Sequence, residues 1–118
     1  MCPSNPYISI GPILAAPGIR AALRAAPARI LAVSPIVGGE ALKGPAAAMM
    51  RQLGQEASAE TVARLYHDFL DIFVLDHRDE RLIEPLQALG LEVHAVETVM
   101  AGPASRVALA GSLLRMLA

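Results

Sequence analysis

Two short apolar runs limit what this chain can fold into. The run ILAVS begins at Ile30 and the run IFVLD begins at Ile72, and they end on the polar residues Ser34 and Asp76. Short continuous apolar runs that contain Val and Ile are typical of strands covered on both faces, as in a parallel sheet flanked by helices. A third run, LEVHAVE from Leu91, alternates more loosely and is expected nearer an edge of the sheet.

Helical patterns lie between and around these runs. Ser58 can cap a helix whose apolar residues follow at i, i+3, i+4 and i+7 from Val62. In the next pattern Pro85 is expected to kink or divide the helix, and Gly90 is placed to end it. The alternation predicts an α/β protein with a mostly parallel sheet. The helical patterns cover residues 17–26, 44–53, 58–69, 82–89 and 107–117.

Composition narrows the class of protein. The 118 residues make one domain at most, and 54% of them are hydrophobic, which is enough to form a core. The net charge of −1 and the absence of a dense Lys/Arg run argue against nucleic-acid or membrane-surface partners. A single cysteine, Cys2, excludes an internal disulfide framework and fits a reducing compartment. No secretory leader and no uncharged apolar run of roughly 20 residues is present, so we predict a soluble, cytoplasmic protein.

The stretch SNPYISIGPIL, residues 4–14, turns abruptly from small and polar to apolar. Small side chains let a backbone approach a ligand, and serine and asparagine offer hydrogen bonds without charge. The plainer interpretation is a solvent-facing loop followed by a helix. In parallel α/β sheets such a loop usually follows a strand, whereas here the chain opens on Met1 with no strand before the loop. We therefore predict an incomplete domain.

The stretch SPIVGGEALKGPAAAMM, residues 34–50, follows the first predicted strand. Gly38 and Gly39 allow positive φ angles, Lys43 supplies a cation, and Gly44-Pro45 opens a helix. This combination suits a phosphate, although the spacing matches neither the P-loop nor the GxGxxG pattern of nicotinamide-binding domains. The alternative is a tight turn with a surface lysine.

Other polar residues are weaker candidates for a binding or metal site. Asp76 and Asp79 in DHRD follow a strand, where a metal or ribose contact competes with a helix N-cap by Asp79. The three histidines have no convincing metal-ligand spacing, so no metal site is predicted. Met49 and Met50 are expected to fill a core or an interface.

Several motifs taken in order resemble one known family. SNPYISIGPIL, VSPIVGGEALKGPAAAMM, the Leu53-Gly54 pair, FVLDHRD and VETVM follow the pattern of the 2-phospho-L-lactate transferases, and the likeness runs from Ser4 to Met100. The family builds a deazaflavin redox coenzyme. The resemblance implies a three-layer, Rossmann-like fold and transfer of a phospholactyl or phosphoenolpyruvyl group from a guanosine diphosphate-linked donor to a deazaflavin acceptor, with magnesium. The implied mechanism is attack of the acceptor's terminal hydroxyl on a phosphoryl group.

The resemblance also implies a binding site. Nucleotide or phosphate contacts are expected from the first motif and from the loop after the first strand; the residues are Ser4, Asn5, Ser9, Gly11, Ser34, Gly38, Gly39 and Lys43. No catalytic base is assigned. The magnesium ligands are expected outside this chain, because family members are longer and carry a glycine-rich loop and acidic residues before their SNP motif.

Residues 1–118 are thus expected to form a single α/β segment like the C-terminal part of such a transferase, inactive on its own. An apolar patch is expected beside the strand that begins at Ile30, leading to self-association or to docking of a missing N-terminal half. The alternative function is a non-catalytic α/β oligomerisation or anion-binding module.

Overall fold

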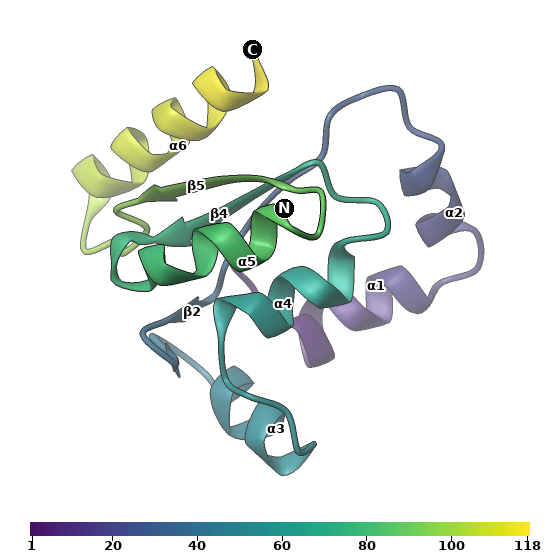
Figure 1. Ribbon diagram of the computed structural model, residues 1–118, viewed down its shortest axis with the longest axis horizontal. Coiled ribbons are helices and arrows are strands. Elements are labelled where there is room, and N and C mark those ends of the chain that lie inside the picture. The colour runs from purple at the N-terminus through teal and green to yellow at the C-terminus, as the bar shows by residue number, and fades with distance from the viewer.

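The three predicted strands form one parallel sheet (Figure 1). The computed structural model describes residues 1–118. In it β1 (Leu31–Val33) and β5 (Glu92–Val96) both pair in parallel with the central strand β4 (Ile72–Asp76). The register sets Leu31 opposite Ile72, and Ile72 opposite Glu92. The predicted parallel α/β sheet is confirmed, with the looser third run at an edge.

Helices cover both faces of this sheet and make three layers. Successive side chains of a strand point to opposite faces, so Phe73 packs toward α4 (Ala59–Tyr66) and α5 (Ile83–Gln87), and Ile72 packs toward α6 (Pro103–Leu117). Figure 1 shows α6 alone on its side of β4 and β5, with α4 and α5 on the other. The Rossmann-like, three-layer arrangement expected from the resemblance is therefore present.

The remaining elements lie in the first half of the chain and after β4. They are η1 (Pro6–Ile10, a π-helix), α1 (Gly11–Ala15), α2 (Ile19–Arg24), β2 (Ile36–Val37), β3 (Glu40–Ala41), α3 (Ala46–Gln52) and η2 (His77–Leu82, a 3₁₀-helix). None of the helices has both the length and the apolar character that crossing a bilayer requires.

The stretch 4–14 is mostly helical and is not a loop. Asn5 starts it, because its side-chain Oδ1 accepts hydrogen bonds from the backbone N–H of Tyr7 at 2.8 Å and of Ile8 at 3.2 Å. The wide π turn then brings the N–H of Gly11 to the carbonyl of Pro6. A Cβ at Gly11 would lie 2.7 Å from that carbonyl oxygen, which explains the glycine. The sequence did not predict this helix, because five residues of π-helix are too few to show a repeat of apolar positions.

Gly38 and Gly39 form the turn of a short antiparallel hairpin, β2–β3, that the sequence analysis missed. The register pairs Val37 with Glu40, so the two glycines are the whole turn, and their φ angles are +59° and +80°. Two successive positive φ angles are the mark of a type I′ hairpin turn, which L-residues with side chains adopt poorly. The glycines are required here by the turn itself.

Of two helix signals, the cap at Ser58 is confirmed and the break expected at Pro85 is wrong. The Ser58 hydroxyl accepts from the Thr61 N–H at 3.1 Å and caps α4, as expected. Pro85 lies in the first turn of α5, where backbone N–H groups have no intrahelical partner, so it does not break that helix. The segment is divided earlier instead, where η2 passes into α5 at Leu82.

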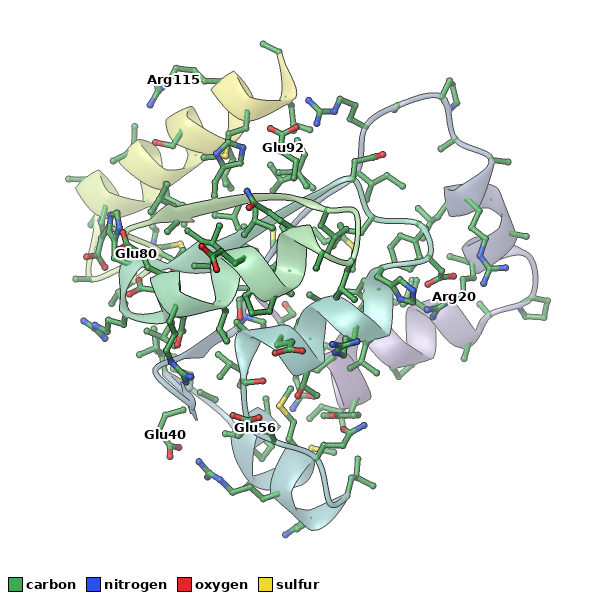
Figure 2. All side chains as sticks on the ribbon, viewed as in Figure 1. Arg20, Glu40, Glu56, Glu80, Glu92 and Arg115 are labelled. Carbon is green, nitrogen blue, oxygen red and sulfur yellow. The ribbon has the colours of Figure 1, made fainter.

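Helix α2 is held to the body of the protein by one charged cluster. The Arg20 guanidinium donates to both carboxylate oxygens of Asp68, at 2.9 and 2.6 Å, and to the carbonyl of Leu65 at 2.7 Å. Arg24 donates to the same carboxylate, and Arg20 also lies over the ring of Phe69. Figure 2 shows Arg20 where α1, α2 and α4 approach one another. The hydrogen bond from Arg20 holds the pKa of Asp68 well below its usual range.

We expect Gly39→Ala to destabilise the protein by roughly 1 kcal/mol, because alanine is strained at positive φ. The new Cβ would also lie 3.4 Å from the carbonyl oxygen of Ala57. Thermal unfolding measures the loss. Gly111→Ala, inside α6, is the matched control and is expected to leave stability unchanged or raise it. Equal effects of the two substitutions would contradict the hairpin assignment.

We expect Asp68→Asn to loosen α2 while the sheet stays intact. The ion pairs are partly exposed, so the cost in unfolding free energy is about 1 kcal/mol or less. Amide exchange of residues 19–24 should accelerate, and Glu84→Gln, which removes an exposed carboxylate without an ion pair, should leave it unchanged. Since the folded-state pKa lies below the ordinary 3.8, the contribution is present above that pH and is lost as the pH falls below it. Unchanged exchange in the Asn variant would contradict this role.

Candidate functional site

A cavity of about 340 Å³ lies where the chain leaves the carboxyl ends of the parallel strands. Ser34 and Pro35, which follow β1, form one wall, and Thr98 and Met100, which follow β5, form another. The residues before η1, the segment after β3 and the first turns of α6 close the remaining sides. Ligands of parallel α/β sheets bind at this edge, so this cavity is the candidate functional site.

Three of the predicted site residues meet in this cavity. Asn5, Ser34 and Lys43 come from three separate segments and all line it. Asn5 is partly engaged already, because its Nδ2 donates to the Met49 sulfur at 3.6 Å while its Oδ1 caps η1. The Ser34 hydroxyl donates to the carbonyl of Ile36 at 2.9 Å and accepts from the N–H of that residue at 3.1 Å. Ser34 therefore fixes the shape of the wall at the end of β1.

The other predicted site residues lie outside the cavity walls. Ser4 precedes Asn5, Ser9 is exposed within η1, and Gly11 borders a separate shallow hollow beside α1. Gly38 and Gly39 belong to the hairpin turn. Their ligand contacts stay predictions from the resemblance.

The cavity carries two cations. Lys43 reaches it from the segment after β3, and Arg106 reaches it from the first turns of α6. Neither forms an ion pair with any carboxylate of the chain. No acidic residue and no histidine lines the cavity. The site is therefore positively charged and suited to an anion. Sequence reasoning missed Arg106, since a single arginine in a helix has no local motif that marks it.

A buried carboxylate holds the Thr98 wall of the cavity in place. Asp76, 1% exposed at the end of β4, accepts from the Thr98 N–H and from the Thr98 hydroxyl, each at 3.0 Å. It also accepts from the Arg78 N–H at 3.1 Å and so caps η2. Burial alone raises the pKa of Asp76, but the hydrogen bonds from Thr98 and Arg78 outweigh it, and the pKa is lowered overall. The carboxylate thus ties the ends of β4 and β5 together.

Asp79 plays a second supporting role. Its carboxylate, 2% exposed, accepts from the N–H of Gly38 at 3.0 Å and so holds the hairpin turn against η2. The N-cap expected of Asp79 is made by Asp76 instead, because Asp76 is the residue at which β4 ends and η2 begins. Both aspartates have structural partners inside the protein.

The cavity offers no carboxylate to a magnesium ion. No three carboxylate, histidine or cysteine side chains come together as a possible metal centre. Asp76 and Asp79, the two acidic residues nearest the strand ends, already accept hydrogen bonds from backbone N–H groups. Magnesium at phosphate sites usually keeps several waters and is held by one or two carboxylates together with phosphates of the substrate, and no carboxylate lines this cavity.

Comparison with known proteins agrees with the motifs. A sequence model of the family described as 2-phospho-L-lactate transferase CofD matches residues 1–108. The chain belongs to the 2-phospho-L-lactate transferase family. It is 44% identical over 98 residues to the 2-phospho-L-lactate transferase of Methanococcoides burtonii, a match that covers 83% of this chain and 31% of the relative.

Two bacterial relatives have another name. The chain is 44% identical over 99 residues to the phosphoenolpyruvate transferase of Kitasatospora aureofaciens, with 83% of this chain and 31% of that protein covered. It is 40% identical over 121 residues to the phosphoenolpyruvate transferase of Mycobacterium avium, with 98% of this chain and 34% of that protein covered. The chain thus spans about a third of the length of the curated relatives it matches.

We expect Thr98→Val to destabilise the protein by about 1–3 kcal/mol, because it removes one donor from a buried carboxylate and keeps the side-chain shape. Thr61→Val is a control at a partly exposed threonine, where a smaller loss is expected. The measurement is denaturant unfolding at two pH values. Since the pKa of Asp76 is lowered, its contribution is present above the ordinary value of 3.8 and is lost as the pH falls below it. The two threonine variants should therefore differ at pH 7 and converge in acid, and a constant difference would contradict the proposed role of Asp76.

Proposed function

We propose that this chain forms the donor-nucleotide side of a transferase that moves a phospholactyl or phosphoenolpyruvyl group from a guanosine diphosphate-linked donor to a deazaflavin acceptor. The cavity described above would bind the diphosphate of the donor. The observation that carries the proposal is a pair of cations without an ion-pair partner, Lys43 and Arg106, which line one cavity at the carboxyl edge of a parallel sheet. Membership of the transferase family supplies the class of substrate.

The presence of two cations supports a diphosphate ligand. Lysine binds a phosphate as a point charge, whereas the planar arginine fork can donate two parallel hydrogen bonds. Because Lys43 and Arg106 come from different elements, they can each approach a different phosphoryl group of one ligand. The Asn5 amide and the Thr98 segment add neutral polar groups to the same walls. The cavity of about 340 Å³ is in the range of small-ligand sites and has room for a diphosphate with part of a nucleoside.

In this proposal the chain has a binding role in the reaction. In the proposed transfer the acceptor hydroxyl oxygen forms a bond to the phosphorus of the donor. The bond from that phosphorus to the bridging oxygen breaks, and guanosine monophosphate leaves with the electron pair. Lys43 and Arg106 would stabilise the negative charge that accumulates on the leaving phosphate. Since no acidic residue or histidine lines the cavity, the hydroxyl proton must go to a group outside it or to water.

The experiment is calorimetric titration of the 118-residue chain with GDP in EDTA, so that only the chain's own groups are measured. Lys43→Ala and Arg106→Ala should each weaken binding by about 1–3 kcal/mol, the usual loss for a charge-assisted hydrogen bond. The matched control is Arg81→Ala, which removes an exposed arginine that has no ion pair and lies outside the cavity. Equal binding by the wild type and both cavity variants would overturn the proposal.

A second series of titrations tests whether the site recognises the guanosine part of the ligand. ADP and inorganic pyrophosphate replace GDP, with the same three variants. Preference for GDP supports a donor-nucleotide site. Binding of pyrophosphate as tight as that of GDP would instead favour the alternative of an anion-binding module. In either case the chain by itself is expected to transfer no group, because the magnesium ligands and the acceptor-binding elements are expected outside it.

A further inference from the structure

We infer that the outer edge of β1 and the adjoining face of α6 form an interface for a parallel strand from the polypeptide that makes up the rest of the family's length. This interface borders the nucleotide cavity and shares Pro3, Met100 and Arg106 with it, but its tests do not use nucleotide binding. Three features carry the inference: the backbone bonds of Met1, an apolar groove, and an exposed stripe on α6 that shares Ala110 and Leu117 with the groove.

Met1 already pairs with β1 as one residue of a parallel strand. Its terminal ammonium donates to the carbonyl of Leu31, and the N–H of Val33 donates to the carbonyl of Met1 at 3.2 Å. These two bonds, to the residues on either side of Ala32, are the pattern of a parallel ladder. The pairing ends there, because Pro3 has no N–H to donate. At the amino end of β1, the N–H of Leu31 faces the same outer edge as the Leu31 carbonyl. A strand that continued before Met1 could accept a hydrogen bond from this N–H.

An apolar groove continues this edge toward α6. It has a volume of about 460 Å³, and ten of its thirteen lining residues are hydrophobic. Met1 and Ile30 form the strand side, and Leu109, Leu113 and Leu117 form the helix side. A strand added beside β1 would place alternate side chains over this groove, since strand side chains alternate between the two faces of a sheet.

Helix α6 has a second apolar face that nothing covers. Leu113 and Met116 pack onto the sheet. Val107, Ala110, Leu114 and Leu117 follow at spacings of three, four and three residues, which places them on one stripe. Val107 is 73% exposed and Leu114 is 68% exposed. A helix with apolar residues on both faces is typical of a buried position, so this stripe needs a partner as well.

The occupant is a different polypeptide segment and not a second copy of this chain. In a two-fold dimer the adjacent β1 strands would run antiparallel, and each would need the positions that Met1 already occupies. A parallel strand that ends at Met1 meets no such obstacle. The matched relatives are about three times as long as the shared region, so their remaining length can supply a strand and a covering helix.

The first experiment lengthens the ladder directly. The segment Thr-Val-Ile-Val-Thr is added before Met1, and Gly-Ser-Gly-Ser-Gly, which has low strand propensity, is added in the control. We expect the amide of Leu31 to exchange roughly tenfold more slowly in the first protein, as one added backbone hydrogen bond implies. Exchange at equal rates in the two proteins would overturn the inference.

The second experiment tests the origin of the partner. The part of the Kitasatospora aureofaciens relative that precedes its match is joined to Met1, and Leu114→Lys is made in this chimaera and in the 118-residue chain. The substitution should lower the Tm of the chimaera by several degrees and leave that of the 118-residue chain nearly unchanged. Leu53→Lys, at a leucine of similar exposure after α3 (60% against 68% for Leu114), is the control and should affect neither protein. Equal effects of the two substitutions in the chimaera would overturn the inference.

Sedimentation of the 118-residue chain tests whether a second copy of this chain occupies the edge of β1 instead. A concentration-dependent dimer in which the Leu31 amide becomes protected would assign the edge to a second copy and overturn the inference. If the chimaera does not fold, the strand extension still decides the question. Because both readouts are structural, a failure here is separate from a failure of GDP binding.

Discussion

The parallel pairing of β4 with both of its neighbours is the constraint on which the rest of the structure depends. All five residues of β4 are buried, so its peptide groups must find partners inside the protein. β1 and β5 supply those partners and must run in the same direction, because helices on the faces of the sheet connect the strands. The three carboxyl ends therefore meet at one edge. The candidate site lies at that edge for this reason.

Two buried aspartates stabilise the edge and leave its charge positive. Asp76 accepts from two backbone N–H groups and from the Thr98 hydroxyl, and Asp79 accepts from the Gly38 N–H, so both hold the loops in place without lining the cavity. Lys43 and Arg106, in contrast, have no partner within the chain. The site therefore has hydrogen-bonded carboxylates buried behind its walls and unpaired cations lining its cavity, and this distribution of charge favours an anionic ligand.

The sequence predicted the regular elements well and the irregular ones poorly. The apolar runs at Ile30 and Ile72 and the cap at Ser58 are local signals, and the structure follows them. Gly38-Gly39 was interpreted as a phosphate loop or a tight turn, and it is a hairpin turn because short flanking segments can pair across two glycines. The helix from Pro6 was hidden because the bond between Gly11 and Pro6 spans a wider turn than helical periodicity detects.

By itself the sequence determined the fold class, the positions of the three main strands and the family, because hydrophobic periodicity and ordered motifs are properties of neighbouring residues. The tertiary structure decided which polar residues meet. Asn5, Ser34 and Lys43 share a cavity while Ser9 and Gly38 lie outside it, and Arg106 joins the cavity from the far end of the chain. Only the packing of α6 against the sheet brings that arginine into the same cavity as Lys43, and no local pattern specifies a meeting of two residues that are 63 positions apart in the sequence (106 minus 43). The same packing decides that α6 covers one face of the sheet while its own second face stays exposed.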